Sequence, residues 1–307
     1  MGIGQTMEYV SLRNDLLFHM VFSRNQAALK ALISALLGIP EAQIKRIEVL
    51  NPMQYSESIG TKLTVLDLKV HLNDGTYILV EMQVRKFKFW TNRTLAYASR
   101  VVADQVTDDF EYGSLEPVIQ ISIMDYSLFP DHRRFFAQYT LRDKENYEYT
   151  DKLRFCVLDL TQIDAATDEQ KRQGLVEWAK AFRARSWAEV NEIENTGVKE
   201  AAKTMQTIMA NSVERELIRM RQDAARDWIT QIRAAERRGA RVAQKAVEQA
   251  EAQAEAQAAR AAQAEARATQ AAAQGKAEMA RGMKRDGVDP ALISKYSGLT
   301  LTEIAVL

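Results

Sequence analysis

The first 160 residues alternate between two hydrophobic patterns. Apolar residues recur every three or four positions over residues 11–22 and 26–37, which predicts two helices, the second ended by Gly38. A longer helix is predicted over residues 91–108. Short apolar or alternating runs predict strands over residues 44–50, 64–72, 76–84, 117–124, 135–140 and 153–158. This order of elements predicts an α/β (α+β) core.

Beyond about residue 165 the pattern is almost entirely helical. Residues 240–274 are rich in Ala, Gln, Glu and Arg, which predicts one long exposed helix. Bulky apolar residues are too few there for a conventional coiled coil, so a spacer is favoured, with homo-oligomerisation through the C-terminal helices as the alternative. Apolar residues return near the end and predict a small helix-turn-helix-like module. The sequence therefore divides into residues 1–165, 166–239, 240–274 and 275–307.

The most informative pattern is a hairpin whose strands flank residues 73–75, Asn-Asp-Gly. A three-residue loop places Lys69 opposite Leu79 and Asp67 opposite Glu81. This register gathers the apolar residues of both strands on one face. A slip by one residue would carry polar groups into the core. Burial therefore predicts that Asp67 and Glu81 lie side by side.

Two carboxylates on opposed strand positions repel each other, so their pairing needs an explanation. A divalent cation between Asp67 and Glu81 would remove the repulsion, and Mg²⁺ commonly binds one or two carboxylates. Lys69 offers a second interpretation, because it shares the face and could neutralise Asp67. A solvated acidic surface is the third. The pattern alone leaves all three open.

Composition narrows the functional class only slightly. The chain has 41 basic and 41 acidic residues, so its overall charge does not indicate nucleic-acid binding, although a local basic patch can still exist. The single cysteine, Cys156, excludes an internal disulfide and a thiolate zinc site. Neither a signal-like N-terminus nor an apolar stretch of about 20 residues is present. We therefore expect a soluble, cytoplasmic protein without a membrane span.

Several segments, taken in order and spacing, carry a family resemblance. They are NDLLFHMVF, LDLKV, VEMQV, RTLAYASRVVADQ and PVIQISIMDYSLF, within residues 10–160. Together they resemble the Rpn-like group (recombination-promoting nucleases, also labelled nuclease-family transposases) of the PD-(D/E)XK nuclease superfamily. The resemblance implies a restriction-endonuclease-like core, with a mixed central sheet flanked by helices, followed by an all-helical C-terminal region. It also implies an Mg²⁺-dependent DNA endonuclease linked to recombination or to defence against foreign DNA.

The resemblance assigns roles residue by residue. Asp67 and Glu81 match the metal ligands, with Mg²⁺ as the expected ion and Mn²⁺ or Ca²⁺ as alternatives. Gln83 stands where the superfamily usually has a lysine; it carries no charge but can orient water or phosphate by hydrogen bonds. Asp15 matches an acid often found on the first helix, and a helix cap is its alternative reading. The missing lysine leaves a catalytically inactive nuclease fold that binds DNA or protein as the competing function.

A basic stretch follows the predicted site. Arg93, Tyr97 and Arg100 are spaced so that they share one face of the predicted helix. Lys86 and Lys88 immediately precede that helix. These four basic residues are predicted to contact the DNA backbone, while Tyr97 could stack on a base or sugar. The alternative is a surface helix with ordinary charges and a tyrosine in the core.

Overall fold

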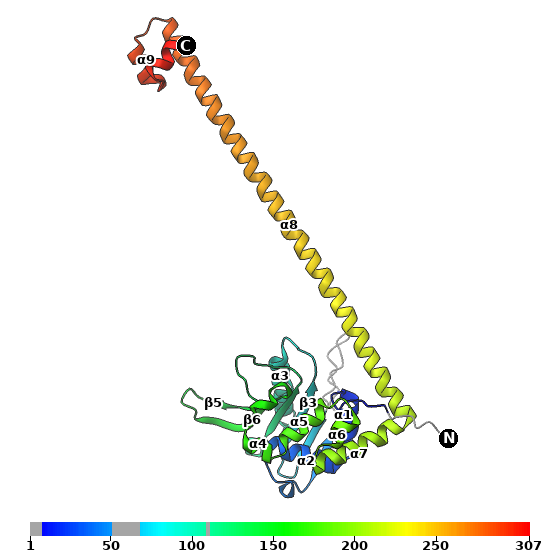
Figure 1. Cartoon of the computed structure of the whole chain (residues 1–307). Coiled ribbons are helices and arrows are strands. Elements are labelled where there is room, and N and C mark those ends of the chain that lie inside the picture. The colour runs from blue at the N-terminus through cyan, green and yellow to red at the C-terminus, as the bar shows by residue number, and fades with distance from the viewer. Residues whose placement is uncertain (1–7, 51–67, 109–110) are drawn as a thin grey trace, which may run out of the picture. The chain divides into compact units, whose positions relative to one another are not determined.

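One mixed sheet organises the molecule. The structure, a computed structural model, describes residues 8–50, 68–108 and 111–307 (Figure 1). In this part of the chain the strands follow the order β1-β2-β3-β4-β6-β5. The β3–β4 and β4–β6 pairs are parallel, and the other pairs are antiparallel. The strands are β1 (Ile47–Leu50), β2 (Leu68–Leu72), β3 (Tyr77–Gln83), β4 (Val118–Met124), β5 (Phe136–Arg142) and β6 (Glu148–Asp159).

Helices flank this sheet and then continue to the C-terminus, which confirms the predicted fold class. Short 3₁₀ turns occur at Glu41–Gln43, Tyr112–Ser114 and Leu160–Ala165. The α-helices are α1 (Asp15–Arg24), α2 (Gln26–Leu37), α3 (Trp90–Ala103), α4 (Asp168–Arg172), α5 (Leu175–Arg183), α6 (Trp187–Asn191), α7 (Thr196–Ala210), α8 (Ser212–Arg285), α9 (Pro290–Ser297) and α10 (Leu301–Val306).

Local capping explains where the first helices begin and end. The side chain of Asn14 accepts a hydrogen bond from the Leu17 amide, so α1 starts later than the predicted residue 11. Asn25 ends α1 and also caps α2 through a hydrogen bond from the Ala28 amide. Gly38, with a φ of 68°, ends α2 as predicted.

The main core lies on one face of the sheet. Alternate strand residues such as Val70, Ile78, Val80 and Ile121 are fully buried there, in one apolar cluster with side chains of α1, α2, α5 and α7. Each such side chain contributes about 1.5–3 kcal/mol on burial. Because side chains alternate along a strand, the residues between those of this cluster point to the opposite face of the sheet.

Helix α3 covers the opposite face. Its residues Ala98 and Val101 form a second buried cluster with Leu79 of β3 and Val118 of β4. The helix ends at Ala103 rather than at the predicted residue 108. Beyond the helix, the side chain of Gln105 makes two hydrogen bonds with the backbone of Glu116. These bonds tie the end of α3 to the segment that leads into β4.

The hairpin register over the described residues is the predicted one. Lys69 pairs with Leu79, and Leu68 with Val80. The loop is closed by a hydrogen bond from the Leu72 amide to the Thr76 carbonyl, 3.0 Å long. Gly75 has a φ of 89°, and a Cβ atom there would also collide with the Glu116 carboxylate, so the turn requires glycine. Asp67 lies outside the described residues.

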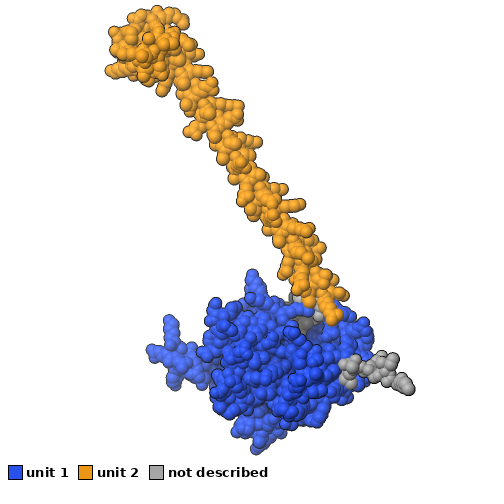
Figure 2. Space-filling view, in the orientation of Figure 1, with its two compact units in different colours: residues 1–225 blue, residues 226–307 orange. Residues whose placement is uncertain are grey.

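The C-terminal region is helical, as predicted. Helix α8 runs without a break from Ser212 to Arg285, and residues 240–274 are exposed throughout. Ala280, Ile293 and Ile304 are buried together where α8, α9 and α10 meet. The chain separates into two compact units, residues 1–225 and 226–307 (Figure 2). The four-part division of the sequence stays a prediction.

Two further observations bear on the environment of the chain. Cys156 is buried in β6 and is a free thiol. Within the described ranges, no helix has both the length and the apolar character needed to cross a membrane.

Candidate functional site

The side chain of Glu81 is the centre of the candidate site. It lies towards the C-terminal end of β3, on the face that α3 covers, and is only 3% exposed. Neither carboxylate oxygen has a hydrogen-bond partner among the described residues. Burial raises the pKa of Glu81 from 4.5 to about 7, and the charge of Arg93 opposes that rise. A solvated acidic surface is therefore the wrong interpretation for this carboxylate, because the folded chain buries it.

Polar side chains of β4 share the buried face with Glu81. In the parallel register Ser122 pairs with Glu81, and Gln120 pairs with Leu79. The Trp90 indole donates a 3.0 Å hydrogen bond to the Ser122 hydroxyl, which fixes the start of α3 against β4. Gln120 is fully buried, and its side-chain oxygen accepts no hydrogen bond within the described part of the chain.

The sequence contains a signal for Gln120 and Ser122, which are not among the predicted site residues. In PVIQISIM they stand two positions apart inside an otherwise apolar run. Alternation of that kind marks one face of a strand as different from the other. Because both faces of β4 are buried, the alternation identifies a polar patch in the interior rather than a solvent-facing side.

Arg93 is the cation whose charge acts on Glu81. Its guanidinium lies 5.2 Å from the ring centre of Tyr97 and 5.6 Å from the ring centres of Phe87 and Trp90. Its buried Nε has no hydrogen-bond partner among the described residues. Aromatic faces hold a guanidinium in place by cation–π attraction. The rings therefore keep the positive charge of Arg93 near Glu81. Gln83, two residues after Glu81 on β3, is uncharged and supplies no positive charge of its own.

Gln83 lies two residues beyond Glu81 and starts the loop into α3. Its side-chain amide donates a 3.0 Å hydrogen bond to the Arg85 carbonyl. The Asp125 amide in turn donates to the Gln83 carbonyl, and the Asp125 carboxylate pairs with Arg13 at 2.5 Å. Gln83 thus joins the end of β3 to both the following loop and the end of β4.

Lys69 lies on β2, opposite Leu79. It is buried on the face covered by α3, and its ammonium lies 5.3 Å from the ring centre of Tyr77. Burial lowers its pKa, while Asp104 near the end of α3 acts in the opposite direction. Its proposed effect on Asp67 concerns a residue outside the described part of the chain.

Two further predicted residues have ion-pair partners. Asp15 receives two hydrogen bonds from Arg221 of α8, at 2.9 and 3.0 Å. Asn14 is the N-cap residue of α1, and Asp15 follows it in the first turn, where its carboxylate also accepts a 2.8 Å hydrogen bond from the Leu16 amide. Arg100 pairs with Asp104 one turn along α3, at 3.0 Å. The ion-pair partners of Asp15 and Arg100 are therefore Arg221 and Asp104.

Lys86 and Lys88 lie in the exposed loop between β3 and α3, as a surface contact with DNA requires. Among the described residues, no group of three or more His, Cys, Asp or Glu side chains is placed to hold a metal ion. Asp67 lies outside the described residues, so its pairing with Glu81 stays a prediction.

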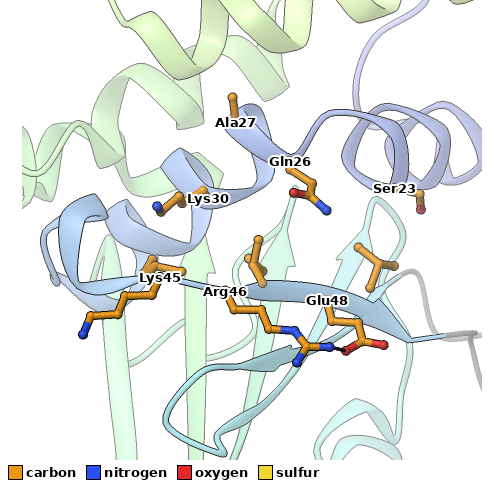
Figure 3. A pocket seen from close by; sticks show the side chains of 10 residues that line it. Ser23, Gln26, Ala27, Lys30, Lys45, Arg46 and Glu48 are labelled. Atoms are coloured by element: carbon orange, nitrogen blue, oxygen red, sulfur yellow. Dashed lines mark hydrogen bonds and ion pairs between the residues drawn. The ribbon is translucent and has the colours of Figure 1, made fainter.

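A separate pocket lies between β1 and the α1–α2 region (Figure 3). Its volume is about 530 Å³, and Lys30, Lys45 and Arg46 give it a basic lining. Its one carboxylate, Glu48, is paired with Arg46 at 2.9 Å. None of the predicted site residues that the structure describes lines this pocket, so we treat it separately from the candidate site.

Comparison with known proteins adds one match. Residues 12–235, well over half of the chain, match the family described as PD-(D/E)XK nuclease family transposase. No curated protein and no solved structure matches the chain. The matched range contains Glu81, Arg93 and the polar residues of β4.

Proposed function

The chain belongs to the PD-(D/E)XK nuclease family transposases, and from that membership we propose that it hydrolyses phosphodiester bonds in DNA as a divalent-cation-dependent endonuclease. The observation that carries this proposal is the buried carboxylate of Glu81, whose two oxygens have no partner among the described residues. A buried acid without partners destabilises a purely structural core. A strongly raised pKa beside a specific charged neighbour is characteristic of functional sites.

The residues near Glu81 fit a hard divalent cation. Carboxylate and amide oxygens are the ligands that Mg²⁺ prefers, and Glu81 and Gln83 both offer them. We assign the second carboxylate to Asp67, since continuing the register beyond the Leu68–Val80 pair reaches Asp67 and Glu81. We propose Mg²⁺ as the ion, with Mn²⁺ or Ca²⁺ as substitutes. A divalent cation at these oxygens would supply the Lewis acid that lowers the pKa of water and neutralises charge on the scissile phosphate.

The remaining roles follow from charge and hydrogen bonding. Arg93, held by three rings, presents a fixed positive charge to a phosphate that reaches Glu81. Gln83 orients the attacking water or the phosphate by hydrogen bonds. Lys86 and Lys88 contact the DNA backbone. We propose recombination or defence against foreign DNA as the biological setting, on the strength of the family alone.

Removal of divalent cations is the first test of this function. The full chain, incubated with supercoiled plasmid, is expected to nick and then linearise it in Mg²⁺ or Mn²⁺, and to leave it intact in EDTA. Excess Mg²⁺ added afterwards should restore cleavage, because it refills the site that EDTA emptied. Gel electrophoresis of the plasmid forms measures both rates.

Two outcomes would count against the proposal. Cleavage that persists unchanged in EDTA would exclude a cation-dependent reaction. DNA binding without cleavage in Mg²⁺, Mn²⁺ or Ca²⁺ would favour the alternative of an inactive nuclease fold, which the replacement of the usual lysine by Gln83 supports.

A further inference from the structure

The loop between β3 and α3 exposes an unusual set of side chains. All six residues from Val84 to Phe89 are exposed, although Met82 before them and Trp90 after them are buried. Phe87 and Phe89 are 41% and 57% exposed. In the sequence VRKFKF these aromatic residues alternate with basic ones, and no acidic residue is present. We call residues 84–89 the aromatic–basic loop.

Hydrogen bonds to the backbone of this loop hold it in its exposed conformation. The Phe87 amide donates to the Tyr126 hydroxyl over 3.2 Å, and Gln83 donates to the Arg85 carbonyl over 3.0 Å. The Phe89 carbonyl accepts a 3.0 Å hydrogen bond from the Arg93 amide, inside the first turn of α3. The rings are therefore displayed by an anchored backbone.

The two phenylalanines differ in what they contact. Phe87 is one of the three rings around Arg93, the residue whose charge acts on Glu81. Phe89 lies 5.3 Å from the ammonium of Lys88 and is the more exposed of the two rings. The exposed aromatic surface thus begins beside the candidate site and extends outward into solvent.

We propose that the aromatic–basic loop binds unpaired bases of DNA, with Phe89 stacked on a base and Lys86 and Lys88 on the adjoining phosphates. An aromatic ring stacks on any base, and basic side chains track the backbone of a single strand. Bases inside a duplex present their edges in the grooves rather than their faces, so stacking on Phe89 requires an unpaired base. This inference rests on the proposed function, and it names DNA with a single-stranded region as the preferred substrate class.

Binding measured in EDTA tests the loop without cleavage. Fluorescence anisotropy would compare the full chain on a labelled single strand of about 20 nucleotides, longer than a usual single-strand site, and on the duplex of the same sequence. Phe89→Ala is expected to weaken single-strand binding about tenfold or more and to change duplex binding little. Phe89→Trp should retain single-strand binding, because indole also stacks.

Tyr149→Ala is the matched control, since it removes an aromatic residue of β6 that is 86% exposed. It should leave both affinities unchanged. Single-strand binding that Phe89→Ala leaves intact would overturn the inference, and so would an equal loss on single strand and duplex. Intact binding would leave the exposed rings for a partner other than DNA, and an equal loss would make the loop a contact to DNA of either form.

The outcomes also separate this inference from the nuclease proposal. A chain that cleaves plasmid in Mg²⁺ but binds single strands independently of Phe89 keeps its nuclease function and loses the role of the loop. A chain that binds single strands through Phe89 but never cleaves DNA keeps the role of the loop and loses the nuclease assignment.

Discussion

Glu81→Gln is expected to stabilise the cation-free protein at pH 8 by roughly 3 kcal/mol and to slow plasmid cleavage by about a thousandfold or more. The two effects have one cause. The folded chain keeps an ionisable carboxyl in a dry position where a neutral amide of the same shape would cost less. The cleavage reaction needs the charge that the amide lacks.

The sign of the stability effect follows from the raised pKa. Folding raises the pKa of Glu81 from 4.5 to about 7. Below pH 4.5 the carboxyl is protonated in both the folded and the unfolded chain, so its burial adds no ionisation cost. As the pH rises, the unfolded chain ionises first, and the cost of folding grows until it levels off above pH 7. The advantage of Gln should therefore be small at pH 4.5 and full at pH 8.

Chemical denaturation in EDTA at pH 4.5 and pH 8 would measure this difference. Glu145→Gln is the matched control, because Glu145 is an exposed residue of the β5–β6 turn and should show no such pH dependence. A Glu81→Gln variant that is less stable than the wild type at pH 8 in EDTA would show that Glu81 is a structural residue. An unchanged cleavage rate would remove it from the site.

Asp67→Ala is expected to lose plasmid cleavage to a similar extent while retaining its unfolding curve and its DNA binding in EDTA. Removing one of two carboxylate ligands takes away the Lewis acid, which contributes several kcal/mol to the transition state. Gel assays in Mg²⁺, denaturation curves and anisotropy on the same preparations measure the three properties. If the alanine variant folds poorly, Asp67→Asn supplies the same test with a side chain of the same size.

Asp151→Ala is the matched control for Asp67, since Asp151 is an exposed acid of β6 with a single distant contact to Lys152 at 4.0 Å. It should cleave plasmid at the wild-type rate. Undiminished cleavage by Asp67→Ala would contradict the assignment of Asp67 as the second metal ligand. A different residue would then have to bind the cation together with Glu81.

The hairpin register could be predicted because two local constraints agree. A three-residue loop with glycine and an alternating pattern of apolar residues admit one alignment of the strands, and the Lys69–Leu79 pair follows it. The mixed sheet and the flanking helices were likewise confirmed, since each element carries its own periodicity.

The burial of Glu81 could not be predicted in the same way. Its burial depends on which face of the sheet α3 packs against, and Ala98 and Val101 contact Leu79 only in the folded chain. The i, i+4, i+7 spacing grouped Arg93 with Arg100. The fold instead places Arg93 among aromatic rings and leaves Arg100 paired with Asp104. Asp15 meets Arg221, 206 positions away, through tertiary packing that no local pattern encodes.

The most direct measurement is a calorimetric titration of Mn²⁺ into the full chain at pH 8, with Glu81→Gln and Asp67→Ala titrated in parallel. The proposed site predicts a saturable binding heat for the wild type that both substitutions abolish or weaken at least tenfold. Binding should also weaken as the pH falls below 7, because protons compete for Glu81. No Mn²⁺ binding by the wild type, or binding that neither substitution changes, would contradict a cation site built on Glu81 and Asp67.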